Sequence, residues 1–143
     1  YMKVSERLIN KIKEFEVFCS KAYKCPAGVW TCGYGHTKRV TPNTFCNKAQ
    51  AEHWLMDDLK PIEIFLSASE EITKTQGRFD ACADFCFNLG IASFQKSTLF
   101  RLIQQKAPSN DIKKQFERWI YCKGKPLEGL KKRRAWEAAE WVR

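Results

Sequence analysis

One segment of this 143-residue chain interrupts an otherwise helical pattern, and it limits the fold more than any other feature. Between residues 20 and 45, short runs rich in Tyr, Val, Trp and Thr are punctuated by Pro26, Gly28, Gly33, Gly35 and Pro42. Such runs, bounded by Gly and Pro, are typical of short strands joined by tight turns. The segment therefore predicts one small antiparallel sheet near the N-terminus.

Helical patterns fill the rest of the chain. A first helix is expected after Ser5, an N-cap residue, and a second after Asn47, which forms a capping-box pattern with Gln50. The second helix should run towards Lys60, where Pro61 kinks or restarts it. Apolar residues at helical spacing predict further helices over residues 79–89, 99–103, 112–120 and from about Leu130 to the end. The expected fold class is α+β and mainly helical.

The charge of the chain points to an anionic partner. Its 25 Lys and Arg residues outnumber 16 Asp and Glu residues, which gives a net charge of +9. Nucleic acid, anionic lipid and acidic cell-wall polymer all attract such a protein. Residues 131–134 form the one basic run, which we interpret as the solvated face of a helix. No nucleic-acid-binding motif is present, so a nucleic-acid partner is not expected.

The chain reads as one domain, residues 1–143, without a repeat or linker. The longest uncharged stretch, residues 25–37, contains three Gly and a Pro, so stable membrane insertion is not expected. No basic start followed by an apolar run marks a signal peptide. Tyr1 precedes Met2, which leaves the native N-terminus open.

The cysteines do not form the framework of a disulfide-rich protein. There are seven, about 5% of the residues against roughly 8–10% in disulfide scaffolds, and the number is odd. Cys82 and Cys86 lie on the apolar stripe of a predicted helix and are interpreted as core residues. No Cys-x-x-Cys motif occurs, and His36 and His53 lack metal-ligand spacing, so no metal site is expected.

One acidic residue is placed for chemistry rather than stability. Glu16 falls in the last turn of the first helix, where a carboxylate opposes the helix dipole, and the Gly-rich segment follows at once. This arrangement can hold an acid over a cleft, facing a second group on the sheet, as hydrolysis of a glycosidic bond requires. An acid with an ordinary pKa of about 4.3 needs partial burial to stay protonated near neutrality.

The residues around this acid match a known pattern. Glu16 is followed after eight residues by Cys25 and after five more by Thr31, and residues 31–37 read Thr-x-Gly-Tyr-Gly-His-Thr. Further matches lie at residues 87–90, 97–99 and 126–134. From about Glu6 to Arg143 the chain resembles the phage-type lysozymes, the endolysins of glycoside hydrolase family 24. Because residue 25 is Cys, the chain resembles the subset of this family that has Cys in place of the catalytic Asp.

The resemblance implies a lysozyme-like fold, with a small β-containing lobe over about residues 17–46 and a helical lobe flanking a substrate cleft. It implies a monomeric muramidase that cuts the β-1,4 bond between N-acetylmuramic acid and N-acetylglucosamine in peptidoglycan without a cofactor. Glu16 matches the general acid, Cys25 the position that is usually Asp, and Thr31 the residue that places the attacking water. A thiol and a hydroxyl are poorly suited to a glycosyl ester, so inversion is expected.

The resemblance also assigns supporting residues. His36 matches a histidine that pairs with an Asp of the following helix, and Asp58 aligns as its partner. Tyr34, Asn88 and Ser97 are expected to contact substrate, the last two from the far wall of the cleft.

The chain departs from the family pattern at four positions. Val17 replaces Gly, Cys25 replaces Asp, Cys32 replaces an aliphatic residue and Glu128 replaces Pro. An ordinary thiol is only a few per cent ionised at neutral pH, but it can be oxidised. In some relatives with Cys at this site a disulfide blocks the thiol, and we hypothesise that Cys19 cages Cys25. The pairing of the other cysteines stays open.

Two other functions remain as alternatives. One is a cationic wall-binding or membrane-permeabilising protein with impaired catalysis, and the other is a glycosidase acting on chitin. An endolysin without a signal accumulates in the bacterial cytoplasm and acts in the periplasm after the inner membrane is breached. A form whose N-terminal signal anchor has been removed would be exported instead.

Overall fold

The computed structural model describes residues 1–143, and its first helix carries the candidate acid at its C-terminal end. α1 (Glu6–Glu16) begins where the Ser5 side chain accepts a hydrogen bond from the Leu8 amide, as the sequence predicts. Its buried residues are Leu8 and Ile12. The helix ends at Val17, whose φ of 56° is a left-handed value.

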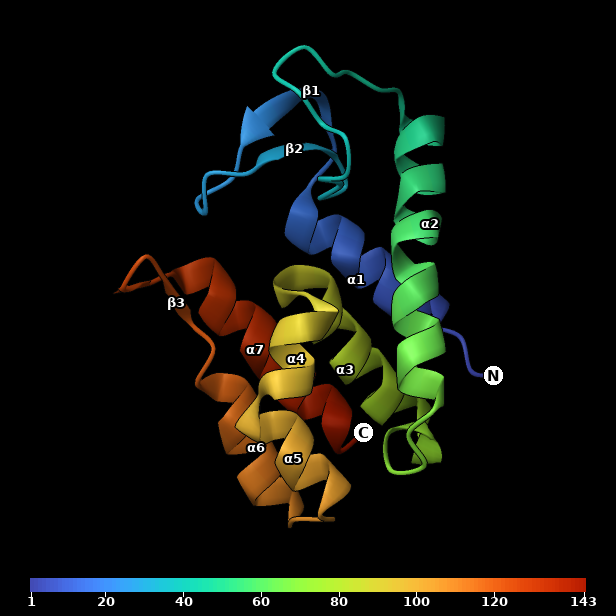
Figure 1. The fold of residues 1–143 in the computed structure, drawn as a ribbon, viewed down its shortest axis with the longest axis vertical. Coiled ribbons are helices and arrows are strands. Elements are labelled where there is room, and N and C mark those ends of the chain that lie inside the picture. The colour runs from blue at the N-terminus through green and yellow to red at the C-terminus, as the bar shows by residue number, and fades with distance from the viewer.

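The small sheet predicted near the N-terminus is present. β1 (Cys19–Lys24) pairs antiparallel with β2 (Trp30–Gly33), so that Tyr23 lies opposite Thr31. The register is irregular between Cys19 and Tyr23. Figure 1 shows this sheet at one end of the molecule, with the later helices gathered towards the opposite end.

A long helix connects the two ends. α2 (Lys48–Ser67) begins at Asn47, whose Oδ1 accepts a hydrogen bond of 2.8 Å from the Gln50 amide. The helix continues through Pro61 to Ser67, so the proline does not restart it. Beyond the proline, α2 still buries two of its apolar side chains, Ile62 and Leu66, and this packing offsets the missing backbone hydrogen bond. In Figure 1, α2 runs along one side of the molecule from the sheet to the helical lobe.

The helical lobe is built around one nearly all-buried helix. This central helix, α3, packs against α1, α2, α4 and α7. It ends as predicted after Leu89, where Gly90 adopts a φ of 96°. The elements of the lobe are η1 (Ile72–Lys74), α3 (Gln76–Leu89), α4 (Ile91–Lys96), α5 (Thr98–Gln104), α6 (Ser109–Glu117) and α7 (Glu128–Trp141).

The sequence reading missed a second sheet. β3 (Tyr121–Cys122) and β4 (Lys125–Pro126) form a short hairpin in a segment for which the sequence predicts no element, and the helix before it ends at Glu117 rather than at Ile120. Its turn, Lys123-Gly124, has φ values of 52° and 79°, the left-handed pair that a tight hairpin requires. The last helix starts at Glu128 rather than Leu130, because the hairpin delivers the chain directly into it.

A single hydrophobic cluster joins the two ends of the molecule. Its 24 buried residues run from Leu8 to Trp141 and include Cys32 and Cys46 beside the small sheet. As predicted, Cys82 and Cys86 are core residues of α3. No helix is long and apolar enough to cross a membrane.

Candidate active site

Glu16 lies where α1, β2 and α7 meet. Its side chain is 17% exposed, and Arg133 Nη1 of α7 donates a 2.7 Å hydrogen bond to its Oε2. The backbone after β2 approaches from another side, because a Cβ at Gly35 would lie 2.7 Å from the Glu16 carboxyl group. Gly35 also has a φ of 73°, so this close approach needs glycine twice over. The carboxylate is thus held from two directions and is still reachable by solvent.

A fully buried carboxylate fixes the arginine in turn. Arg133 Nε and Nη2 donate hydrogen bonds of 2.9 Å to the two carboxylate oxygens of Asp84, on α3. Burial raises the pKa of Asp84, but the charge and hydrogen bonds of Arg133 outweigh it and lower the pKa overall. Burial likewise disfavours the Arg133 charge, but Asp84 and Glu16 outweigh this and raise its pKa. The chain Asp84–Arg133–Glu16 is therefore a charged, preorganised support for the candidate acid.

The interpretation of residues 131–134 as a solvated helix face is wrong for half of them. Lys131 and Lys132 are exposed, whereas Arg133 and Arg134 are buried. Arg134 Nη2 donates to Asn88 Oδ1 at 2.8 Å and to Glu137 Oε2 at 2.9 Å. Neighbouring helical residues point about 100° apart, so a run of four bases spans both the outside and the inside of α7.

Cys25 and Thr31 flank the turn between β1 and β2. The Cys25 amide donates to the Val29 carbonyl at 3.0 Å, and the Gly28 amide donates to the Cys25 carbonyl at 2.8 Å. Thr31 is buried, and its hydroxyl donates to the same Val29 carbonyl at 3.0 Å. Since the only hydroxyl proton is used there, the Thr31 oxygen is left as an acceptor.

Tyr23 is a further residue of this region that the sequence reading did not select. Burial raises its pKa, and the negative charges of Glu16 and Cys25 act in the same direction. Tyr23 lies in β1, directly opposite Thr31 of β2. Glu16, Cys25 and Thr31 form no hydrogen bond with one another, so any cooperation among them needs a molecule in between.

The pair of His36 and Asp58 that the resemblance implies is present. His36 Nδ1 lies 2.7 Å from Asp58 Oδ2. Burial raises the pKa of Asp58, and the interaction with His36 opposes this rise. The ring of His36 stacks on Trp54 with centroids 4.5 Å apart.

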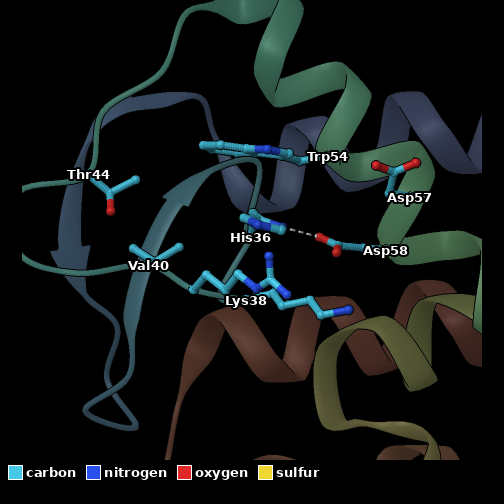
Figure 2. Close-up of a pocket in the computed structure, with 8 residues that line it drawn as sticks. His36, Lys38, Val40, Thr44, Trp54, Asp57 and Asp58 are labelled. Carbon is cyan, nitrogen blue, oxygen red and sulfur yellow. Dashed lines mark hydrogen bonds and ion pairs between the residues drawn. The ribbon is translucent and has the colours of Figure 1, made fainter.

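Figure 2 shows this stack and ion pair at the wall of an open hollow. The hollow has a volume of about 460 Å³ and is also lined by exposed Lys38 and Arg39. His36 thus joins the turn after β2 to α2 and fixes the small sheet on the long helix.

The three side chains expected to contact substrate each contact other groups of the protein. Tyr34 is buried against Phe18, with ring centroids 5.6 Å apart. Asn88 Oδ1 accepts from Arg134, as described above. Ser97 caps α5, because its Oγ accepts from the Phe100 amide at 3.0 Å and donates to a backbone carbonyl at 2.6 Å. None of these three side chains forms a hydrogen bond with Glu16, whose side-chain partner is Arg133.

The missed residues Asp84 and Arg133 carried a readable signal. Asp80 and Asp84 lie one turn apart on a helix whose other residues are mostly apolar, and a buried carboxylate demands a partner. No three His, Cys, Asp or Glu side chains gather in a way that could hold a metal ion.

The order of these elements and residues matches one protein family. Residues 13–137 fit the family model described as phage lysozyme. This chain belongs to the phage lysozyme family. The match includes Glu16, the small sheet, and all but the last turn of α7.

Individual members of the phage lysozyme family cover most of the chain. An endolysin of Acyrthosiphon pisum secondary endosymbiont phage 1 is 36% identical over 142 residues, which cover 96% of this chain and 97% of that relative. An endolysin of Bacillus phage PZA is 34% identical over 96% of this chain, but this chain spans only 54% of that relative. A SAR-endolysin of Escherichia phage Mu is 32% identical over 83% of this chain and 69% of the relative.

A solved muramidase domain has the same fold. The muramidase domain of SpmX from Asticaccaulis excentricus superposes with a TM-score of 0.85 at 29% identity. The match covers 100% of this chain and 99% of that domain. The lysozyme-like α+β fold expected from the sequence is thereby confirmed.

Proposed function

We propose that this chain is an endolysin-type muramidase, a single catalytic domain over residues 1–143 that hydrolyses the β-1,4 bond between N-acetylmuramic acid and N-acetylglucosamine in peptidoglycan. The observation that carries the proposal is the position of Glu16. It is a partly exposed carboxylate at the end of α1, held by Arg133 and packed against Gly35, which follows the strand pair whose turn is flanked by Cys25 and Thr31. Membership in the phage lysozyme family and the likeness to a muramidase domain support it.

Glu16 acts as the general acid in this proposal. Its proton passes to the glycosidic oxygen as the bond from that oxygen to the anomeric carbon breaks. The carboxylate that remains is stabilised by the Arg133 guanidinium, 2.7 Å away. Asp84 keeps Arg133 in place and shares its charge, so that Arg133 does not pair with Glu16 alone.

A water held by Thr31 and Cys25 attacks the opposite face of the sugar. The Thr31 hydroxyl donates to Val29, so its oxygen accepts a hydrogen bond from this water and turns a water lone pair towards the anomeric carbon. The oxygen of water bonds to that carbon, and the proton it loses leaves through Cys25 or solvent. This route inverts the anomeric configuration, because no group of the protein forms a bond to the sugar.

The supporting residues have two different roles in the proposal. His36 and Asp58 hold the turn after β2 against α2, and so act on the site through the backbone. We also propose that the glycan contacts Tyr34, Asn88 and Ser97. Each of these side chains must then share or exchange its present contact within the protein when the glycan binds.

Clearing of purified peptidoglycan tests the proposal. We expect Glu16→Gln to lower the rate by a factor of about 100 or more, because loss of a general acid typically costs roughly 10²–10⁴. Glu14→Gln is the matched control, since Glu14 lies on the same helix with a side chain that is 69% exposed. NMR of the first product should show inversion of the anomer.

Other outcomes of these assays would favour the alternatives. Equal clearing by wild type and Glu16→Gln would point to a cationic wall-binding or membrane-permeabilising protein. Release of soluble sugars from chitin in preference to peptidoglycan would point to a chitin-directed glycosidase. Product with net retention would contradict the placed-water route.

The partner in this proposal is the cell wall, and the chain works as a monomer without nucleic acid or a cofactor. The net charge of +9 favours binding to an acidic wall polymer. The endolysin is made in the cytoplasm of the host bacterium and acts in the periplasm. Its similarity to a SAR-endolysin supports an exported form.

A further inference from the structure

Two buried thiols touch each other beside the small sheet. Cys32 lies on β2, and Cys46 lies just before α2. Their Sγ atoms are 3.6 Å apart, and the two residues are 0% and 5% exposed. Both Sγ atoms also lie near the Cys19 carbonyl oxygen, at 3.7 and 3.9 Å.

The backbone fixes both residues at this distance. Cys32 exchanges two backbone hydrogen bonds with His36, of 2.9 and 3.0 Å. The Cys46 amide donates to the Ser20 carbonyl at 2.8 Å, next to a bridge between Lys21 and Phe45. Bonded sulfurs lie about 2.05 Å apart, so the gap is small enough to close by side-chain rotation.

The same fold opposes two other pairings. Cys19 and Cys25 are separated by the length of β1, where six residues at ~3.3 Å each span about 20 Å, against a limit of about 7 Å between bridged Cα atoms. The earlier hypothesis that Cys19 cages Cys25 therefore requires β1 to unfold. Cys82 and Cys86 are one helical turn apart, with Cβ atoms about 5–6 Å apart, which is beyond the usual disulfide range.

We propose that Cys32 and Cys46 form a disulfide when this protein folds in the presence of a disulfide oxidant. A thiolate of one cysteine attacks a low-molecular-weight disulfide or an oxidised dithiol protein and forms a mixed disulfide. The thiolate of the other cysteine then displaces the oxidant. Two protein thiols become one disulfide, and the oxidant disulfide leaves as two thiols. Cys25 takes no part and stays a free thiol.

The order of events follows from burial. Burial and the contact with Cys32 raise the pKa of Cys46 to about 11, so little thiolate is present in the folded protein. Oxidation is therefore slow after folding and fast while the small sheet is still forming. The closed ring spans residues 32–46 and includes His36 and two lining residues of the hollow in Figure 2, Lys38 and Arg39.

Disulfide mapping of the full chain tests this site. The reduced, unfolded protein is refolded with oxidised glutathione, its free thiols are alkylated, and it is digested without reduction by trypsin and chymotrypsin together. Cleavage after Trp30 separates Cys25 from Cys32, so the expected linked fragments contain residues 31–34 and 46–48. Cys25 should be recovered alkylated. Free Cys32 and Cys46 in the refolded protein, or a link from either one to Cys19, would overturn the proposal.

Thermal unfolding gives a second readout. A ring of about 15 residues should raise the unfolding midpoint of the oxidised protein by about 5–10 °C over the reduced one. Cys19→Ser, the nearest competing thiol, should keep this rise, and Cys46→Ala should lose it. If Cys46→Ala does not fold, the mapping of the wild type still decides. An equal rise in Cys46→Ala would refute the assignment.

Discussion

Replacing Asp84 by Asn tests whether the buried carboxylate behind Arg133 controls the candidate acid. The side chain keeps its shape but loses its charge, so Arg133 is left with Glu16 as its only carboxylate partner. Breaking a buried ion pair on one side costs about 3–5 kcal/mol, and the remaining contact to Glu16 places the cost near about 3 kcal/mol. For a chain of this size that corresponds to a fall in the unfolding midpoint of about 10 °C.

The effect on catalysis has a definite sign. With Asp84 neutral, the whole Arg133 charge favours the ionised form of Glu16, which cannot donate a proton. The pH profile of kcat/KM on soluble peptidoglycan should therefore move to lower pH, by about one unit. The contribution of Asp84 to the free energy of unfolding should also depend on pH. Because the pKa of Asp84 is lowered in the fold, its contribution is present above the ordinary value of about 3.9 and is lost as the pH falls through the folded value. The stability difference between wild type and Asp84→Asn should shrink below about pH 4.

Asp80→Asn is the matched control. Asp80 is equally buried, lies one turn earlier on α3, and accepts hydrogen bonds from Ser5 instead of Arg133. It should lose stability without a shift of the pH profile. Identical profiles for wild type, Asp84→Asn and Asp80→Asn would refute the role given to Asp84.

Two further sets of substitutions test the glycine beside Glu16 and the His36–Asp58 pair that holds the small sheet. Gly35→Ala should nearly abolish activity, because its Cβ would meet the Glu16 carboxyl group at 2.7 Å, whereas Gly124→Ala has a similar φ of 79° with no atom within 4 Å and should cost only about 1–2 kcal/mol of stability in a denaturation curve. His36→Ala should cost about 1–3 kcal/mol, and a double-mutant cycle with Asp58→Asn should show a coupling of at least about 0.5 kcal/mol. Full activity of Gly35→Ala, or additive effects in the cycle, would contradict these expectations.

Local signals in the sequence predicted the helix ends well and the helix interiors less well. Ser5 and Asn47 cap helices because their side chains reach amides three residues on, which is a property of a few neighbouring residues. Gly90 ends α3 for an equally local reason. The sequence could not predict that the helix would run unbroken through Pro61, because Ile62 and Leu66 beyond it are held by burial in the folded core.

The candidate site divides in the same way. Glu16 is readable because motif and spacing surround it. Its partner Arg133 lies in a basic run that looks solvated, and only the packing of α7 on α3 turns that side chain inward. Asp84 completes the chain from a third helix. Three interacting residues from three helices leave no spacing pattern in one sequence. A buried carboxylate on an apolar helix nevertheless indicates that it has a charged or hydrogen-bonding partner.

The pairing of Glu16 with Arg133 has a consequence for the synthesis of the enzyme on the ribosome. The two residues stand 117 positions apart, at the end of the first helix and in the last one. A ribosome emits the chain from its N-terminal end, at about 5–20 residues per second. The acid is therefore synthesised seconds before the arginine that holds it, and every nascent chain that lacks α7 carries an unfinished site. The site of an enzyme that breaks down its host's wall is thus completed only after α7 has been made.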